Sequence, residues 1–132
     1  MNRKILITGA FLGLSAIVLG AFGAHGLKKF VSDSEVASFS TGVTYQMYHA
    51  LFCLFLGVFN QIGSMWQSRI FNFLLSGIIL FSGSIYLLVI DSLFNVDLSA
   101  IGFITPLGGL LLIISWILLI ISLLKIRQNF NG

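Results

Sequence analysis

The sequence predicts an all-α integral membrane protein, a four-helix bundle with antiparallel up-down spans and cytoplasmic termini. Hydrophobic residues make up 58% of the 132 residues and charged residues only 8%, whereas a soluble domain carries about 25% charged residues. The mean hydropathy is +1.05. Four stretches also approach the length of about 20 apolar residues that a helix needs to cross a bilayer.

The four predicted spans follow one another with short polar connections. They cover residues 5–24, 44–59, 70–90 and 106–124. The second span is the least apolar, because it contains Gln46 and His49. No internal repeat or linker is visible, so residues 1–132 are predicted to form a single transmembrane domain, as the length of the chain also suggests.

The first span has some features of a signal peptide, since Arg3 and Lys4 precede it and Ala21-Phe22-Gly23 is similar to a cleavage site. Its apolar run is longer than the apolar region of most signal peptides, so we expect it to be a span. Small residues repeat along it every three or four positions, a pattern that lets membrane helices approach closely. The residues predicted to pack helices are Gly9, Gly13, Ala16 and Gly20 here, and Gly77 and Gly108 in the third and fourth spans.

Two helix starts have recognisable caps. Ser32 and Glu35 form a capping-box pattern, which predicts a helix from about Asp33 and makes residues 33–43 a wet extension of the second span. Thr105 followed by Pro106 predicts the start of the fourth helix, with Thr105 as its N-cap. The connection before it has no clear period, and we expect its segment 100–104 to lie at the membrane interface.

The basic residues predict the orientation, because they favour the cytoplasmic side. With four spans, the termini and the middle loop share one side, which holds Arg3, Lys4, Arg69, Lys125 and Arg127. The opposite side holds Lys28 and Lys29 together with every acidic residue, namely Asp33, Glu35, Asp91 and Asp97. The chain is therefore predicted to lie in the inner (plasma) membrane with its N- and C-termini in the cytoplasm.

Hydrogen-bonding side chains gather at one predicted depth, in the outer leaflet. Polar residues inside a membrane are costly and usually face the protein interior, so this cluster is the candidate site. Its members are His25, Tyr45, Gln46, His49, Ser82, Ser84, Tyr86, Asp91 and Thr105.

Three interpretations of this cluster stay open at this stage. It is a structural network of interhelical hydrogen bonds, a site for a small ligand or lipid head group between helices, or a haem, metal or quinone site at His25 and His49. In the haem case, Lys28 and Lys29 would meet the propionates. Two histidines alone form a weak metal signature, so no metal and no cofactor are predicted.

Other chemistry has less support in the sequence. The lone Cys53 lies in an apolar run and belongs to no zinc motif, and no catalytic constellation can be named, so no enzymatic activity is predicted. The basic residues are scattered and form no stripe for nucleic acid. A proton path would need ionisable groups at mid-depth, which the spans lack.

Four segments in order make the chain similar to a known family. They are GAFGAHGL (20–27), TYQMYHAL (44–51), FSGSIYLL (81–88) and ITPLGG (104–109). They resemble the motifs of the domain of unknown function 423 family, also called uncharacterised protein family 0382, which is similar to animal transmembrane protein 256. The resemblance implies a four-span inner-membrane protein and no established activity. The chain departs from the family in a longer loop before ITPLGG and in Ser115-Trp116, where the family tends to have Gly-Trp.

We therefore predict a non-catalytic binding or accessory module of the membrane. Its expected partners are membrane lipid and either a larger membrane complex or a second copy of the chain, with no nucleic acid. The alternative is a haem, metal or quinone/lipid site at His25 and His49. A small transporter or channel subunit, formed by an oligomer, is the third.

Overall fold

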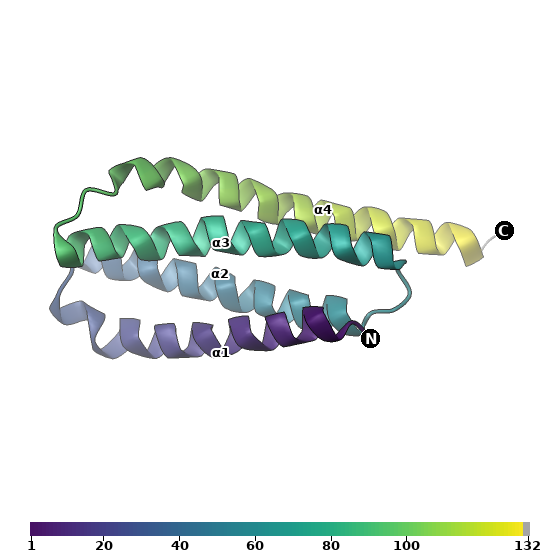
Figure 1. Ribbon diagram of the computed structural model, residues 1–132, viewed down its shortest axis with the longest axis horizontal. Helices are drawn as coiled ribbons and strands as arrows, with labels where there is room; N and C mark the ends of the chain where they lie inside the picture. The colour runs from purple at the N-terminus through teal and green to yellow at the C-terminus, as the bar shows by residue number, and fades with distance from the viewer. Residues whose placement is uncertain (131–132) are drawn as a thin grey trace.

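The fold is all-α, as predicted. The computed structural model describes residues 1–130, with side chains as far as Ile126. In Figure 1 the long helices lie side by side, and the N-terminus lies at the same end of the molecule as the end of the last helix. Within residues 1–130 the elements are α1 (Arg3–His25), η1 (Leu27–Lys29), α2 (Asp33–Val58), α3 (Ser64–Phe94), η2 (Ser99–Phe103) and α4 (Ile104–Phe130), where η marks a 3-10 helix.

Three stretches of the described chain are long and apolar enough to cross a membrane, namely 3–29, 64–94 and 99–126. They contain α1, α3 and α4. Helix α2 is not among them, because Gln46 and His49 in its middle and the serine, threonine and acidic residues of its first half lower its hydropathy. The second predicted span, over residues 44–59, thus stays a prediction at this point.

The two predicted helix starts have different outcomes. The capping box of α2 is confirmed, since the Glu35 backbone N–H donates to Ser32 Oγ over 3.3 Å and the Ser32 N–H donates to Glu35 Oε2 over 2.8 Å. The N-cap role of Thr105 is wrong. Segment 99–103 coils as η2 and continues directly into α4 at Ile104, so Thr105 lies inside the helix and its hydroxyl bonds Ser84 instead.

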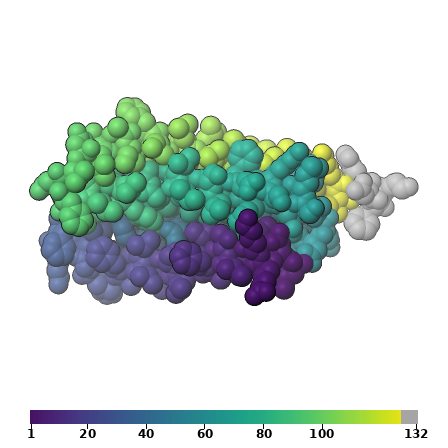
Figure 2. Space-filling view, in the orientation of Figure 1, coloured from purple at the N-terminus to yellow at the C-terminus, as the bar shows by residue number. Residues whose placement is uncertain are grey.

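The helices pack as two pairs, α1 against α2 and α3 against α4, and α2 joins the pairs by packing on α3. Figure 2 shows the pairs as two layers, the N-terminal half of the chain below and the C-terminal half above. The fully buried side chains of Cys53, Leu56, Ile70 and Leu74 lie in the core cluster between them.

The small-residue face of α1 does pack on α2, but with unequal closeness. A Cβ at Gly9 would lie 3.1 Å from the carbonyl oxygen of Ala50, and one at Gly20 would lie 3.3 Å from Val43. At Gly13 the nearest atom would be 3.9 Å away, which is ordinary contact. Ala16 is buried. This face of α1 thus lies against α2, yet Gly13 is not a close-approach position, because α2 presents only the methyl group of Ala50 there.

The predicted packing glycines of the second pair are the tightest of the predicted set. A Cβ at Gly77 would lie 2.7 Å from the Leu112 side chain, and one at Gly108 would lie 2.3 Å from the backbone nitrogen of Phe81. A side chain can move away but a helix backbone cannot, so Gly108 is where α3 and α4 require glycine.

The charges separate to the two ends of the molecule. A hydrogen bond from Ser92 to Glu35 joins the start of α2 to the end of α3, so the four acidic residues lie at one end of the molecule. We call it the acidic end. Lys28 and Lys29 lie there as well. At the other, basic end the N-terminal amine donates to Asn60 over 2.7 Å, and Arg3, Lys4, Arg69 and Lys125 lie there. The side chain of Arg127 lies outside the described residues.

Candidate functional site

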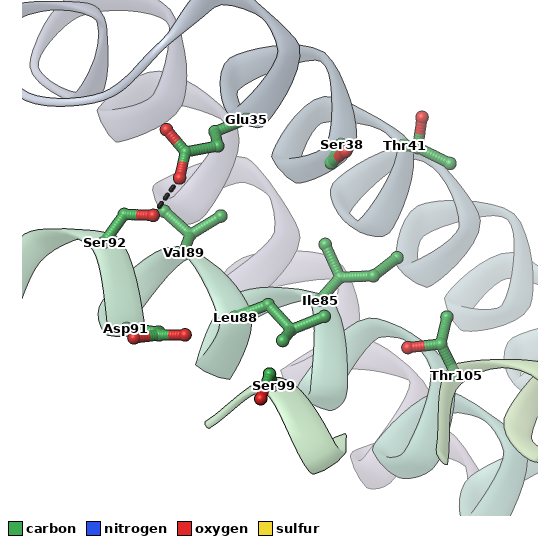
Figure 3. A pocket seen from close by; sticks show the side chains of 10 residues that line it. All are labelled: Glu35, Ser38, Thr41, Ile85, Leu88, Val89, Asp91, Ser92, Ser99 and Thr105. Carbon is green, nitrogen blue, oxygen red and sulfur yellow. Dashed lines mark hydrogen bonds between the residues drawn. The ribbon is translucent and has the colours of Figure 1, made fainter. Parts of the chain in front are cut away.

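A cleft of about 600 Å³ opens at the acidic end between α2, α3 and η2. We call it the acidic-end cleft (Figure 3). Apolar side chains of α3, including Ile85 and Leu88, line it together with hydroxyl groups from α2, η2 and α4. Glu35 and Asp91 add carboxylates. The lining residues are Glu35, Ser38, Thr41, Ile85, Leu88, Val89, Asp91, Ser92, Ser99 and Thr105.

The two carboxylates of this cleft differ in how far they are already bound. Glu35 accepts from the backbone N–H and hydroxyl of Ser32 at Oε2, over 2.8 and 2.9 Å, and from the Ser92 hydroxyl at Oε1. Asp91 is half-buried and makes no side-chain hydrogen bond to any residue that the structure describes. Asp91 is therefore the acid that a ligand can engage without breaking a helix cap.

The wall formed by η2 is held by Asp97. Its Oδ1 accepts from the Ser99 hydroxyl over 2.7 Å and from the Ser99 backbone N–H over 3.1 Å. These bonds lower the pKa of Asp97 below its ordinary value, so the carboxylate is ionised at neutral pH. Asp97 thus fixes the turn that presents Ser99 to the cleft.

The centre of the predicted polar cluster is a closed hydrogen-bond network. The buried amide of Gln46 donates from Nε2 to the Leu12 carbonyl oxygen and Ser15 Oγ on α1, over 2.9 and 2.8 Å. The Tyr86 hydroxyl on α3 donates to Gln46 Oε1 over 2.7 Å. Gln46 therefore links α1, α2 and α3, and both N–H donors of its amide are engaged within the protein.

His49 is engaged at both ring nitrogens. Nδ1 lies 2.7 Å from the Tyr45 carbonyl oxygen, and the Trp116 indole donates from Nε1 to His49 Nε2 over 3.1 Å. An indole N–H only donates, so Nε2 accepts and Nδ1 carries the proton. His49 is thus a neutral link between α2 and α4, and a ligand could reach Nε2 only by displacing Trp116.

The serines predicted in the third span also bond to neighbouring helices. Ser82 Oγ donates to the Gly42 carbonyl oxygen on α2 over 2.7 Å, and Ser84 Oγ lies 2.5 Å from Thr105 Oγ1 on α4. Among the described side chains, no buried nitrogen or oxygen lacks a hydrogen-bond partner. These residues behave as helix contacts.

The structure does not bring His25 and His49 together. Gly23 packs against Phe39 and Gly13 lies opposite Ala50, so His49 is level with about residue 13, some 12 residues along α1 from His25. At 1.5 Å per residue this separates the histidines by about 18 Å, whereas one metal ion holds imidazole nitrogens at about 2 Å. The exposed His25 ends α1, and the two do not form a ligand pair.

The predicted cluster therefore divides into three parts. Gln46, His49, Ser82 and Tyr86 belong to interhelical contacts, Asp91 and Thr105 line the acidic-end cleft, and His25 stands apart. Tyr45 is exposed and packs on Phe81, with ring centroids 5.1 Å apart. Ser84 is buried and bonds to Thr105, which lines the cleft.

Sequence reasoning missed several members of these sites. Ser15 and Trp116 complete the network, and Ser92 and Ser99 line the cleft. Ser15 lies next to Ala16 of the small-residue face, and this position was the one sequence feature that could have placed it in the network. Glu35 was assigned only its capping role, because the sequence does not show that α3 ends beside it.

Known proteins are similar to this chain over nearly its whole length. The model of a family described as "Protein of unknown function (DUF423)" matches residues 19–109. The UPF0382 membrane protein YwdK of Bacillus subtilis (strain 168) is 43% identical over 128 residues, covering 93% of this chain and 98% of the relative. The UPF0382 membrane protein SAB0533 of Staphylococcus aureus (strain bovine RF122 / ET3-1) is 42% identical over 123 residues, covering 93% and 97%. No solved structure matches the chain.

Proposed function

This chain belongs to the DUF423 family of proteins of unknown function, whose relatives are named UPF0382 membrane proteins, and we propose that it is a non-catalytic ligand-binding protein of the membrane. The acidic-end cleft is the binding site, and an amphiphile with an ammonium head group is the ligand. The observation that carries this proposal is that Asp91 lines an open cleft of about 600 Å³ together with apolar side chains of α3.

The chemistry of the cleft favours such a ligand. An ammonium group donates hydrogen bonds to carboxylates and hydroxyls, and bonds between charged groups are about twice as strong as neutral ones. Asp91 supplies a carboxylate without a side-chain partner among the described residues, and Ser38, Thr41 and Ser99 supply hydroxyls at the rim. Ile85 and Leu88 offer contact to a hydrocarbon part. Clefts of this size between helices, with a few polar groups, are common ligand sites.

We further propose four antiparallel spans with both termini in the cytoplasm. α2 crosses the bilayer because it matches α1 from end to end, with the Asn2 N–H donating to the Gly57 carbonyl oxygen at one end and Gly23 packing on Phe39 at the other. Its polar groups Gln46 and His49 face other helices and not lipid. The separation of the charges supports an orientation with the basic end in the cytoplasm, because basic residues favour that side.

Binding is tested on the full chain in detergent by native mass spectrometry. Phosphatidylethanolamine, whose ammonium group has N–H donors, is titrated against phosphatidylcholine, whose quaternary ammonium has none. Asp91→Asn is compared with Asp33→Asn, which makes the same charge change at the same end outside this cleft. We expect Asp91→Asn to weaken phosphatidylethanolamine binding about fivefold and Asp33→Asn to change it less than twofold, because a lost charge contact costs about 1 kcal/mol. Equal effects of the two variants would refute the site.

Topology is tested by fusing a reporter that is active only in the cytoplasm. We expect activity after Gly132 and none after positions in 28–38 or 91–105. The reverse pattern would overturn the orientation while leaving the cleft experiment unaffected.

A further inference from the structure

The basic end contains a second cleft, of about 320 Å³, where the connection between α2 and α3 meets the end of α4. We call it the basic-end cleft. Trp66, Lys125 and Gln61 line it together with Ser122. It lies at the opposite end of the molecule from Glu35 and Asp91, so its chemistry is independent of the proposed function.

Positive charge concentrates on one aromatic ring of this cleft. Lys125 Nζ lies 4.5 Å from the centroid of the Trp66 ring, and Arg69 Cζ lies 6.0 Å from it. Cations at these distances are attracted by the ring, which orients them without neutralising them. The Lys125 ammonium is exposed and makes no hydrogen bond to any side chain that the structure describes, so its donors can serve a ligand.

No acidic side chain competes for these cations. All four aspartates and glutamates of the chain belong to the acidic end, so the basic-end cleft has no side-chain carboxylate to satisfy. α3 begins at this cleft, and its N-cap Gly63 has no side chain to cap the first backbone N–H groups. The positive end of the dipole of this 31-residue helix therefore adds to the positive potential in the cleft. An anion is the complementary ligand.

The walls of the cleft are fixed and partly apolar. The buried Gln67 donates from Nε2 to the carbonyl oxygens of Leu56 and Phe59, over 3.0 and 2.9 Å, and so fastens the start of α3 to the end of α2. Ile62 is buried beside it, and Ile126 is half-buried. A tryptophan with a polar edge at a helix end is typical of the membrane interface.

We propose that the basic-end cleft binds the phosphate group of an anionic membrane lipid, with Lys125 as its cationic contact and Trp66 as the platform that holds the head group. A site of basic residues between membrane helices is the arrangement that binds such head groups. The apolar wall of Trp66 and Ile126 favours a lipid over free phosphate, because it gives the glycerol and first acyl carbons a surface to contact.

The test uses the full chain in detergent and native mass spectrometry. Phosphatidylglycerol and phosphatidylcholine are titrated separately onto the wild type, Lys125→Gln, Lys125→Arg and Lys4→Gln. Inorganic phosphate is then added to the phosphatidylglycerol complex as a competitor. Lys4 is the matched control, since it is an exposed cation at the same end that does not line the cleft. We expect one phosphatidylglycerol to bind in preference to phosphatidylcholine, about fivefold more weakly to Lys125→Gln, and almost unchanged to Lys125→Arg and Lys4→Gln.

Three outcomes would overturn the proposal. Equal losses from Lys125→Gln and Lys4→Gln would show diffuse attraction to the basic end. Equal binding of phosphatidylcholine would remove the need for net negative charge. Displacement of phosphatidylglycerol by millimolar inorganic phosphate would make a free phosphate the ligand. None of these outcomes involves Asp91, so failure here is separate from failure of the acidic-end cleft.

Discussion

The two helix pairs are held together in different ways. Between α1 and α2 the closeness is uneven. A Cβ at Gly23 would lie 2.8 Å from the Phe39 ring, whereas one at Gly13 would lie 3.9 Å from its nearest neighbour. The buried amide of Gln46 also bonds across this contact. Between α3 and α4 the backbones touch at Gly108, and the one side-chain hydrogen bond between these two helices among the described residues joins Ser84 to Thr105.

This difference shows two solutions to one problem. Lipid is as apolar as leucine, so burying leucine does not drive helices together, and close packing or interhelical hydrogen bonds must do so. The α3–α4 pair relies on the backbone contact at Gly108, whereas the α1–α2 pair adds the polar bonds of Gln46 to glycine contacts with side chains. Variants of the two pairs should therefore respond to different substitutions.

The largest effect is expected from Gly108→Ala. The new methyl group would lie 2.3 Å from the Phe81 backbone nitrogen, so α4 must move away from α3, and overpacking of this kind costs about 3 kcal/mol. The free energy of unfolding is measured by titrating dodecyl sulfate into detergent micelles. Gly109→Ala is the control, because its methyl group would lie 3.7 Å from the Phe81 ring. Similar losses in both variants would contradict the close contact.

The next effect is expected from Gln46→Leu, at about 2 kcal/mol, because the Tyr86 hydroxyl loses its acceptor inside the protein. The same unfolding assay measures it. Adding Tyr86→Phe removes the stranded hydroxyl, so the double variant should be less destabilised than the sum of the single ones. Strict additivity would show that the two side chains do not share a bond.

A smaller effect is expected where the pairs meet. His49→Leu should cost about 1 kcal/mol, because it strands the Trp116 N–H, whereas His49→Gln should cost less, since an amide oxygen can accept that proton. Indole emission together with unfolding free energy reports the change. If leucine is tolerated as well as glutamine, the link between α2 and α4 contributes nothing.

The smallest effect is expected from Gly13→Ala, within about 0.5 kcal/mol, because α1 has room there. Gly9→Ala on the same helix should cost about 1 kcal/mol, since its methyl group would press on the Ala50 carbonyl oxygen and Leu54 at 3.1 Å. Unfolding of the two variants side by side measures the difference. A greater loss at Gly13 would mean that α1 packs in another register.

The candidate sites were predictable to different degrees. The capping box at Ser32 and Glu35 is local, so the spacing of two residues is enough to predict it. The polar cluster was predicted from depth, which places residues at a level but not on a face. Depth alone could not distinguish Gln46, whose amide bonds to neighbouring helices, from Asp91, which lines an open cleft.

The sequence by itself determined the class of the protein, its helices, the separation of its charges and most of its packing glycines, because composition and short-range spacing specify these properties. Only the tertiary structure decided that His25 and His49 lie apart, that the Trp116 indole donates a hydrogen bond to His49, and that clefts open at both ends. The reason is rotational and axial register. A helix pair can slide and turn against its neighbour without changing any local pattern, and packing at contacts such as Gly108 against Phe81 selects the one arrangement that brings distant residues together.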